Sequence, residues 1–363
     1  MFSTRAGTEA IALLNDSLSS VKGDIKTIIA RVANTNDMCP SISSRMVAYY
    51  SDCLDYNIVG GKLARARTVL EAHAMCTTDA VSVDSPQVKA AVVFGWAVEI
   101  LQAFFLIEDD VMDKGEVRRG RPCWYHVPTV GIANAINDGL LLEQVLYELI
   151  STNPNTKQYE HAAHSILRQA SMRTVLGQHL DTHPPESVLD FTRAQWLSVV
   201  RFKTAFYTFT LPCELGILVS GRKFSESDLS KFRSVGLLVG ELFQAQDDML
   251  DCFGTPELIG KVGRDIEEGK CTWLWYTAME LVAQEDFLKQ ELVTLYSSSE
   301  RAVDPEVVRR VKQIYKQVGV ENEFQTYSGK LADDIRGLVN QISAPELQTL
   351  GTWLLTSTQH RKK

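Results

Sequence analysis

Two long stretches of apolar residues at helical spacing constrain the fold of this 363-residue chain more than any other feature. Pro86–Asp113 and Ser227–Asp251 each run for more than 20 residues, with apolar side chains on most turns. A 3.6-residue period over this length predicts long core helices. Asp84-Ser85-Pro86, Asp304-Pro305 and Ser343-Ala344-Pro345 place a capping residue before a proline and predict helix starts.

The alternation typical of strands is scarce in this sequence. Ala80–Val83 and Val199–Phe202 fit short strands, but each adjoins a helical pattern. The longest polar stretch, Ser151–Thr156, has only the length of a loop, so no linker divides the chain. We expect an all-α fold in a single domain that spans residues 1–363.

Charge and cysteine content narrow the function classes. The net charge of -8 argues against a general nucleic-acid or anionic-membrane binder, which needs a basic surface. The cysteines are widely spaced without a C-x-x-C pair, which is typical of reduced thiols packed as small apolar groups. The seven cysteines are Cys39, Cys53, Cys76, Cys123, Cys213, Cys252 and Cys271.

The termini and apolar stretches bear on location. Met1–Asn15 lacks the apolar core of a signal peptide, so we expect a cytoplasmic protein, with a weak mitochondrial presequence as the alternative. Ala90–Ile107 is interrupted by Glu99 and Gln102. This stretch therefore predicts a buried helix rather than a membrane span, and we expect no stable membrane insertion.

Two acidic clusters end the two long apolar stretches. They are Asp109-Asp110-x-x-Asp113 and Asp247-Asp248-x-x-Asp251. The first and last aspartates of each cluster lie one helical turn apart, so their carboxylates can share a hard cation. One such cluster alone is more often a solvated helix end. Two clusters on apolar helices, where unpaired carboxylates are costly, favour metal binding, and neither follows the EF-hand pattern.

Basic residues follow both clusters. Magnesium binds through a few carboxylates together with phosphate oxygens of a substrate, so the clusters predict a diphosphate held between them. Arg118 and Arg119 follow the first cluster, and Lys261 and Lys270 follow the second. Each could be a surface cation alone, but their recurrence favours contacts with phosphate.

With their flanking residues, these motifs resemble those of the trans-prenyltransferases, and within that family the eukaryotic farnesyl diphosphate synthases. The resemblance covers about residue 57 to the C-terminus and implies an all-α bundle around a central cavity, usually a homodimer acting on isoprenoid diphosphates. The matching segments are Gly60-Gly61-Lys62-x-x-Arg65, Asp109–Gly120, Gly177-Gln178-x-Leu180-Asp181, Phe202–Tyr207, Gly240–Asp251, Gly260–Cys271 and Arg361–Lys363.

The resemblance also implies roles for individual residues. Three Mg²⁺ ions, or Mn²⁺ in their place, would bind Asp109, Asp113, Asp181 and Asp247, with Asp110, Asp248 and Asp251 assisting directly or through water. The allylic diphosphate would contact Arg118, Lys203, Lys261 and Lys270. Isopentenyl diphosphate would contact Lys62, Arg65, Gln102, Arg119 and Arg361. The reacting carbons would be lined by Thr204, Tyr207, Phe243 and Gln244.

The implied reaction is head-to-tail condensation of isopentenyl diphosphate with dimethylallyl and then geranyl diphosphate to give farnesyl diphosphate. Ionisation of the allylic diphosphate would be assisted by Mg²⁺ and the surrounding cations. His179 and His183 flank Asp181, and we expect them to have a structural or solvent role rather than that of a base.

Product length is predicted to depend on Phe104 and Phe105. Phe105 lies one turn before Asp109 on the same helix face, so a chain growing along that helix would meet an aromatic floor. From spacing alone, the alternative is an ordinary core position. Within the resembled family, two aromatic residues here suggest a C15 product.

Three other functions remain open. A terpene synthase on the same scaffold would keep the acidic clusters but typically lose the isopentenyl diphosphate ligands, which are present here. A geranyl diphosphate synthase would stop one condensation earlier, and a non-catalytic partner subunit would have eroded clusters. The chain departs from the family pattern at Ala64, Ala66, Arg67 and Arg264, and in the segment Thr182–Pro185.

Overall fold

The structure is a computed structural model, and it describes residues 3–34, 39–77, 82–255, 263–282 and 287–360. The chain forms two compact units. The first unit comprises Met1–Gln169 and Leu211–Lys223, and the second comprises Ala170–Thr210 and Phe224–Lys363. Within the described residues, helices account for nearly all regular structure, which confirms the all-α prediction.

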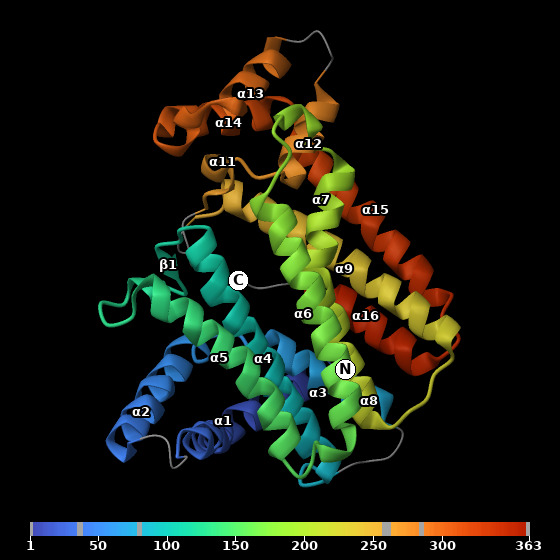
Figure 1. The fold of residues 1–363 in the computed structure, drawn as a ribbon. Helices are drawn as coiled ribbons and strands as arrows, with labels where there is room; N and C mark the ends of the chain where they lie inside the picture. The colour runs from blue at the N-terminus through green and yellow to red at the C-terminus, as the bar shows by residue number, and fades with distance from the viewer. Residues whose placement is uncertain (1–2, 35–38, 78–81, 256–262, 283–286, 361–363) are drawn as a thin grey trace. The chain divides into compact units, whose positions relative to one another are not determined.

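The first unit is built from helices with one short hairpin (Figure 1). α4 packs along both α3 and α5, and α3 also packs on α8. β1 and β2 pair antiparallel, with Val117 opposite Pro122 and Arg118 opposite Arg121. The elements of this unit are α1 (Ser3–Ala33), α2 (Pro40–Asn57), α3 (Ala64–Cys76), α4 (Pro86–Met112), β1 (Val117–Arg118), β2 (Arg121–Pro122), η1 (Trp124–His126), α5 (Gly131–Thr152), η2 (Lys157–Tyr159) and α8 (Leu211–Ser220). α6 (Glu160–Thr182) begins in this unit and continues into the second.

α4 is the core helix of the first unit. Its N-cap Ser85 accepts a hydrogen bond from the Val88 amide at 3.2 Å, and Pro86 occupies the first turn, as predicted. By length and composition this helix could span a membrane, but 83% of its apolar window is buried inside the protein. It therefore serves as a core helix that ends at the first acidic cluster.

Glycine and alanine residues bring α3 close to its two neighbours. A Cβ added at Gly95 of α4 would lie 3.2 Å from the Ala66 side chain, and one at Gly216 of α8 would lie 2.5 Å from the Val69 carbonyl oxygen. These contacts leave no room for a larger side chain at Gly95 or Gly216, so they fix the position of α3 against α4 and α8. The start of α3, which carries Arg65, is positioned by this packing.

The second unit contains the remaining elements (Figure 1). α9 packs against η4, α12, α15 and α16. The elements are η3 (Val188–Asp190), α7 (Arg193–Val199), the π-helical η4 (Val200–Thr210), α9 (Glu226–Phe253), α11 (Asp265–Glu268), α12 (Trp273–Leu281), α13 (Phe287–Ser297), η5 (Ser299–Ala302), α14 (Pro305–Gln317), α15 (Val320–Asn340) and α16 (Pro345–Gln359).

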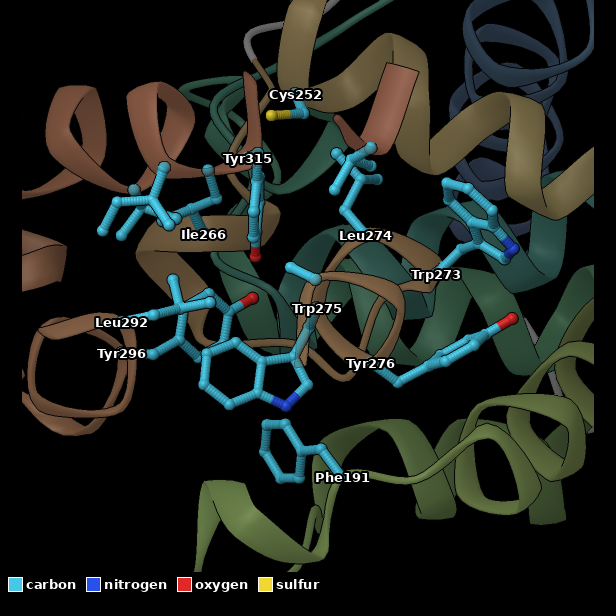
Figure 2. Packing of buried hydrophobic residues seen from close by; sticks show 14 of the residues in the cluster. Phe191, Cys252, Ile266, Trp273, Leu274, Trp275, Tyr276, Leu292, Tyr296 and Tyr315 are labelled. Carbon is cyan, nitrogen blue, oxygen red and sulfur yellow. The ribbon is translucent and has the colours of Figure 1, made fainter. Parts of the chain in front are cut away.

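Aromatic residues dominate the core of the second unit (Figure 2). The ring of Trp275 in α12 lies 4.2 Å from that of Tyr296 in α13 and 6.2 Å from that of Phe191. Tyr315 of α14 and Cys252 of α9 belong to the same cluster. This cluster joins α12, α13 and α14 to the end of α9, where the second acidic cluster lies.

Most local predictions are confirmed. The stretch Ser227–Asp251 lies within α9, and Asp304 caps α14 by accepting a hydrogen bond from the Glu306 amide at 2.8 Å. The helix at Pro345 begins as expected, although Ala344 has no capping side chain. All seven cysteines are free thiols and five of them are buried.

Val199–Phe202, which also fits a strand pattern, is helical as the neighbouring pattern indicated, because these residues pass from α7 into the π-helical η4. The segment fits a strand pattern because Val199 and Val200 are β-branched, and β-branched residues are common in strands. Of the other candidate strand, Ala80 and Val81 lie outside the described residues, while Ser82 and Val83 are not in a strand. No local sequence pattern predicts the β1–β2 hairpin or the wide turns of η4.

Candidate active site

The first acidic cluster lies at the C-terminal end of α4. Asp109 and Asp113 are both partly exposed and one turn apart, and the Asp113 amide donates to the Asp109 carbonyl at 2.8 Å. Asp110 is buried instead, and its Oδ1 accepts hydrogen bonds from Arg118 Nε at 2.9 Å and Nη2 at 2.5 Å. The carboxylates of Asp109 and Asp113 are therefore accessible to a ligand, while the carboxylate of Asp110 binds Arg118.

Arg118 also contacts the outer part of the cluster, because its Nη2 lies 3.2 Å from Asp109 Oδ2. Burial by itself would lower the pKa of Arg118, but Asp110 and Asp109 raise that pKa above its ordinary value overall. The guanidinium therefore stays cationic, fixed beside the metal-binding carboxylates that the sequence predicts.

Arg119, which follows Arg118, lies in a turn with strained backbone. Lys114 and Arg119 adopt left-handed backbone conformations with φ of 52° and 54°, which non-glycine residues rarely do. Arg119 Nη1 donates to the Asn57 carbonyl at 3.0 Å, and a Cβ at Gly61 would lie 2.9 Å from Arg119 Nη2. The guanidinium thus lies on the Gly60-Gly61 turn.

The charge around Arg119 favours an anion. Burial lowers the pKa of Arg119, and the neighbouring cations Arg118, Arg65 and Arg121 lower it further, while Glu99 opposes them. Arg119 and these three neighbouring arginines form a positive field that a diphosphate would relieve. The structure thus brings predicted residues Arg65, Arg118 and Arg119 together.

The start of α3 and the middle of α4 complete this basic cluster. Leu63, with φ of 49°, precedes α3; Lys62 beside it is exposed and Arg65 half-buried. Glu99 Oε1 accepts from the Ala66 amide at 3.0 Å, which satisfies one of the amides at the start of the helix. Gln102 is buried, and its Oε1 has no hydrogen-bond partner within the described residues.

The two predicted chain-length residues differ in burial, although their rings lie 5.0 Å apart: Phe104 is buried and Phe105 is half-buried. Phe104 lies against Gly139 of α5, where a Cβ would come 3.3 Å from its ring. The carboxyl group of Glu108, one turn further along α4, contacts the same glycine, and burial raises the pKa of Glu108 to about 7. Phe105 instead shares the face of Asp109. Phe104 thus packs between α4 and α5, and the chain-length role of both residues stays a prediction.

In the second unit, two lysines converge on Asp181 near the end of α6. Lys203 Nζ donates to Asp181 Oδ2 at 2.6 Å. Lys270 Nζ lies 3.8 Å from the same oxygen and 3.0 Å from Glu268 Oε2. Asp181 and both lysines are only partly exposed, so this cluster can exchange partners with a charged ligand while remaining largely shielded from water.

Lys203 and its neighbours come from the π-helical η4. Thr204 Oγ1 donates to Gln244 Oε1 of α9 at 3.2 Å, and Tyr207 is buried on the same segment. The ring of Phe243 lies 5.4 Å from that of Phe209. A π-helix commonly marks a functional segment, and here it places Lys203 and Thr204 together.

Asp248 is a buried carboxylate with three donors. Its Oδ1 accepts from Gln244 Nε2 at 2.9 Å, and its Oδ2 accepts from Trp196 Nε1 at 2.9 Å and the Trp273 amide at 2.7 Å. Burial raises the pKa of Asp248, although the hydrogen bonds from Gln244, Trp273 and Trp196 oppose this shift. Asp248 thereby connects Thr204 and Gln244 to the aromatic core.

The outer aspartates of the second cluster differ in exposure. Asp247 is half-buried, whereas Asp251 is buried and its Oδ2 accepts from the Asp265 amide at 2.9 Å. That bond holds the start of α11, which leads to Glu268 and Lys270. Asp251 thus orders the segment that follows the second cluster.

The remaining predicted residues are placed as follows. Lys261 and Arg361 lie outside the described residues. His179 and His183 are exposed, with their rings stacked 4.3 Å apart, and their predicted structural or solvent role stays a prediction. Sequence reasoning missed Trp196 and Trp273, because no local motif signals a contact with an aspartate 52 or 25 positions away.

Within the described part of the chain, no three His, Cys, Asp or Glu side chains converge closely enough to hold a metal ion. Magnesium, however, keeps several water ligands and uses one or two carboxylates together with substrate phosphate oxygens. In the first unit Asp109 and Asp113 are partly exposed carboxylates with Arg118 beside Asp109, and in the second unit Asp181 and Asp247 are partly exposed with Lys203 beside Asp181; each set fits ligands of this kind.

The family whose sequence pattern matches residues 47–318 is described as Polyprenyl synthetase. The chain belongs to this family. Members of this family use divalent metal ions. Farnesyl pyrophosphate synthase of Saccharomyces cerevisiae is 36% identical over 81% of this chain and 83% of its own length. The Mus musculus protein of the same name is 35% identical over 87% of this chain and 88% of its own.

A solved structure agrees in fold. T. brucei farnesyl diphosphate synthase, in complex with a bisphosphonate, matches with a TM-score of 0.85 at 27% identity, over 98% of this chain and 100% of that chain. The resemblance noted from the motifs is confirmed by these matches, and the fold is that of an all-α isoprenoid synthase.

Proposed function

We propose that this chain is a farnesyl diphosphate synthase, which condenses isopentenyl diphosphate head to tail with dimethylallyl and then geranyl diphosphate. The observation that carries this proposal is the convergence of Lys203 and Lys270 on Asp181. Two ammonium groups beside one partly shielded carboxylate fit a metal-bound diphosphate, because Asp181 would hold the metal ion while the lysines would bind phosphate oxygens. The names of the relatives support the same activity.

The basic cluster of the first unit supports the second substrate. Arg118 and Arg65 lie close enough to Arg119 to lower its pKa, and the carbonyl oxygen of Gln102 has no partner in the described residues. We assign Lys62, Arg65, Arg119 and Gln102 to isopentenyl diphosphate. Because all four are present, a condensing enzyme is favoured over a terpene synthase.

Asp109, Asp113, Asp181 and Asp247 would hold the Mg²⁺ ions, three in number by resemblance. When bound, Mg²⁺ stabilises the negative charge that develops on the departing diphosphate. We assign Asp110 and Asp248, which are both buried and hydrogen bonded, to positioning: Asp110 orients Arg118, and Asp248 orients Gln244 and through it Thr204.

The chain's own groups act on the leaving diphosphate and on the allylic cation. Arg118, Lys203 and Lys270 neutralise the leaving diphosphate, so the allylic C–O bond ionises. The hydroxyl of Thr204 and the carbonyl oxygen of Gln244 present electron-rich atoms to the allylic cation. The double bond of isopentenyl diphosphate attacks this cation and forms the new C–C bond. A proton is then lost from the resulting tertiary cation, and we assign the released diphosphate as its acceptor.

We further propose a homodimer in the cytoplasm. Ile132, Ile136 and Leu140 recur every four residues on α5 and are 55%, 39% and 52% exposed. An apolar stripe of this kind is typical of a surface that a second copy covers. Seven free cysteines agree with a reducing compartment.

The proposal is tested with purified protein and Mg²⁺ in two reactions. The first contains dimethylallyl and isopentenyl diphosphates, and farnesyl diphosphate is the expected product. The second contains farnesyl diphosphate alone, and no reaction is expected. Hydrocarbon in the second reaction with no condensation in the first would replace the proposal with a terpene synthase.

A further inference from the structure

The position of Lys270 depends on backbone that belongs to no regular element. Lys270 lies between the one-turn helix α11 and α12, yet its ammonium group lies 3.0 Å from Glu268 Oε2 and 3.8 Å from Asp181 Oδ2. A long side chain on an irregular segment keeps such a position only if the backbone beneath it is held.

A buried hydroxyl group holds that backbone. Tyr296 Oη donates to the Lys270 carbonyl at 2.8 Å, while the Lys270 amide donates to the Asp265 carbonyl at 2.9 Å. Both polar groups of the Lys270 backbone are therefore paired. One of the two partners is a side chain from α13, 26 residues further along the chain.

Tyr296 is itself fixed by the aromatic core of the second unit (Figure 2). Its side chain is fully buried, and its ring packs on Trp275 at 4.2 Å. Trp275 Nε1 in turn donates to the Val188 carbonyl at 3.1 Å. The hydroxyl group of Tyr296 thus points from a rigid cluster toward the diphosphate-binding segment.

A second contact from the same region reinforces the arrangement. Gly269 has a φ of 67°, and a Cβ there would lie 2.7 Å from Arg301 Cζ. Arg301 Nη1 donates to the Ser298 carbonyl at 2.6 Å, so the guanidinium is anchored in the turn that follows α13. Gly269, the residue before Lys270, is therefore covered by Arg301, which follows shortly after Tyr296 in the chain.

We propose that Tyr296 is a positioning residue for the condensation reaction, which holds the Lys270 ammonium group at the allylic diphosphate through the hydrogen bond to the Lys270 carbonyl. This inference rests on the proposed function. Because the Tyr296 side chain is fully buried in the aromatic core, we assign it no substrate contact and expect its effect to pass through Lys270.

The test is a cycle of Tyr296→Phe, Lys270→Ala and the double variant in the full-length enzyme. Steady-state kinetics with varied geranyl diphosphate and inhibition by inorganic pyrophosphate with Mg²⁺ give the affinity for the diphosphate group. We expect Tyr296→Phe to raise KM and weaken pyrophosphate inhibition about three- to tenfold, the cost of one hydrogen bond. In the Lys270→Ala background we expect Tyr296→Phe to change neither value further.

Tyr327→Phe is the matched control. It also removes a largely buried hydroxyl group from the second unit, but that hydroxyl donates to Glu241 Oε1 at 2.5 Å rather than to the Lys270 segment. We expect it to lower thermal stability without changing KM or pyrophosphate inhibition.

The outcomes separate this inference from the proposed function. A wild-type enzyme that condenses, with Tyr296→Phe unchanged in KM and inhibition, contradicts the inference alone. The inference would also be overturned if the fold-changes in KM of Tyr296→Phe and Lys270→Ala multiplied in the double variant, because Tyr296 would then act independently of Lys270. A wild-type protein that performs no condensation would refute the proposed function instead.

Discussion

Replacing Gly177 with alanine tests how α6 and η4 create the diphosphate site. Gly177 packs directly on the η4 backbone, where a Cβ would lie 2.5 Å from Lys203 Cα, against the 3.4 Å of an ordinary contact. The Lys203 backbone nitrogen and the Phe202 carbonyl carbon would lie closer still, so the backbone of Lys203 must move by at least 0.9 Å, the difference between these two distances. Lys203 carries the ammonium group that lies 2.6 Å from Asp181, so the site is displaced with it.

The expected costs follow from this displacement. Overpacking against backbone costs about 1–3 kcal/mol, and the better helix propensity of alanine returns about 1 kcal/mol, so we expect a net loss of up to about 2 kcal/mol. A shift of nearly 1 Å at a catalytic group lowers kcat/KM by roughly 100-fold. Chemical denaturation and steady-state kinetics measure the two effects.

Gly329→Ala in α15 is the matched control. A Cβ at Gly329 meets nothing within 4 Å, so the same substitution should stabilise the protein by about 0.5–1 kcal/mol and leave activity unchanged. If Gly177→Ala behaves like Gly329→Ala in both assays, the close contact between α6 and η4 does not position Lys203.

Three further perturbations have expected outcomes. Burial lowers the pKa of His73 below its ordinary 6.5, so the unfolded chain takes up the proton first. Stability should therefore fall as the pH drops below about 6.5, and His73→Gln should flatten this dependence in denaturation curves; an unchanged curve would contradict the assignment. Removing divalent metal with EDTA should abolish condensation and excess Mg²⁺ should restore it, so activity that persists in EDTA would rule out a metal-dependent reaction. Phe105→Ala, alone or with Phe104→Ala, should give products longer than C15 by chromatography, because Phe105 shares the face of Asp109; C15 from the double variant would refute the aromatic floor.

The sequence predicted those features of the fold that depend on local pattern. α4 and α9 were predicted from apolar periodicity, and Ser85 and Asp304 from capping chemistry, because each signal lies within a few residues of its effect. Both acidic clusters lie at the ends of these helices for the same reason. The single-domain organisation stays a prediction.

Other features depend on contacts between distant residues. Asp110 was predicted as an assisting metal ligand, but its pairing with Arg118 depends on a turn with left-handed Lys114 and Arg119, residue types that do not signal this conformation. The donors to Asp248 come from Trp196 and Trp273, 52 and 25 residues away. Such partners are set by tertiary packing, so no local motif identifies them.

The most direct test of the account measures pyrophosphate released and isopentenyl diphosphate consumed in one reaction with dimethylallyl diphosphate and Mg²⁺. We predict one pyrophosphate for each isopentenyl diphosphate consumed, and two of each for every farnesyl diphosphate formed. Pyrophosphate released from an allylic substrate while isopentenyl diphosphate remains unconsumed would contradict the assignment of the two units' charged clusters to a condensation reaction.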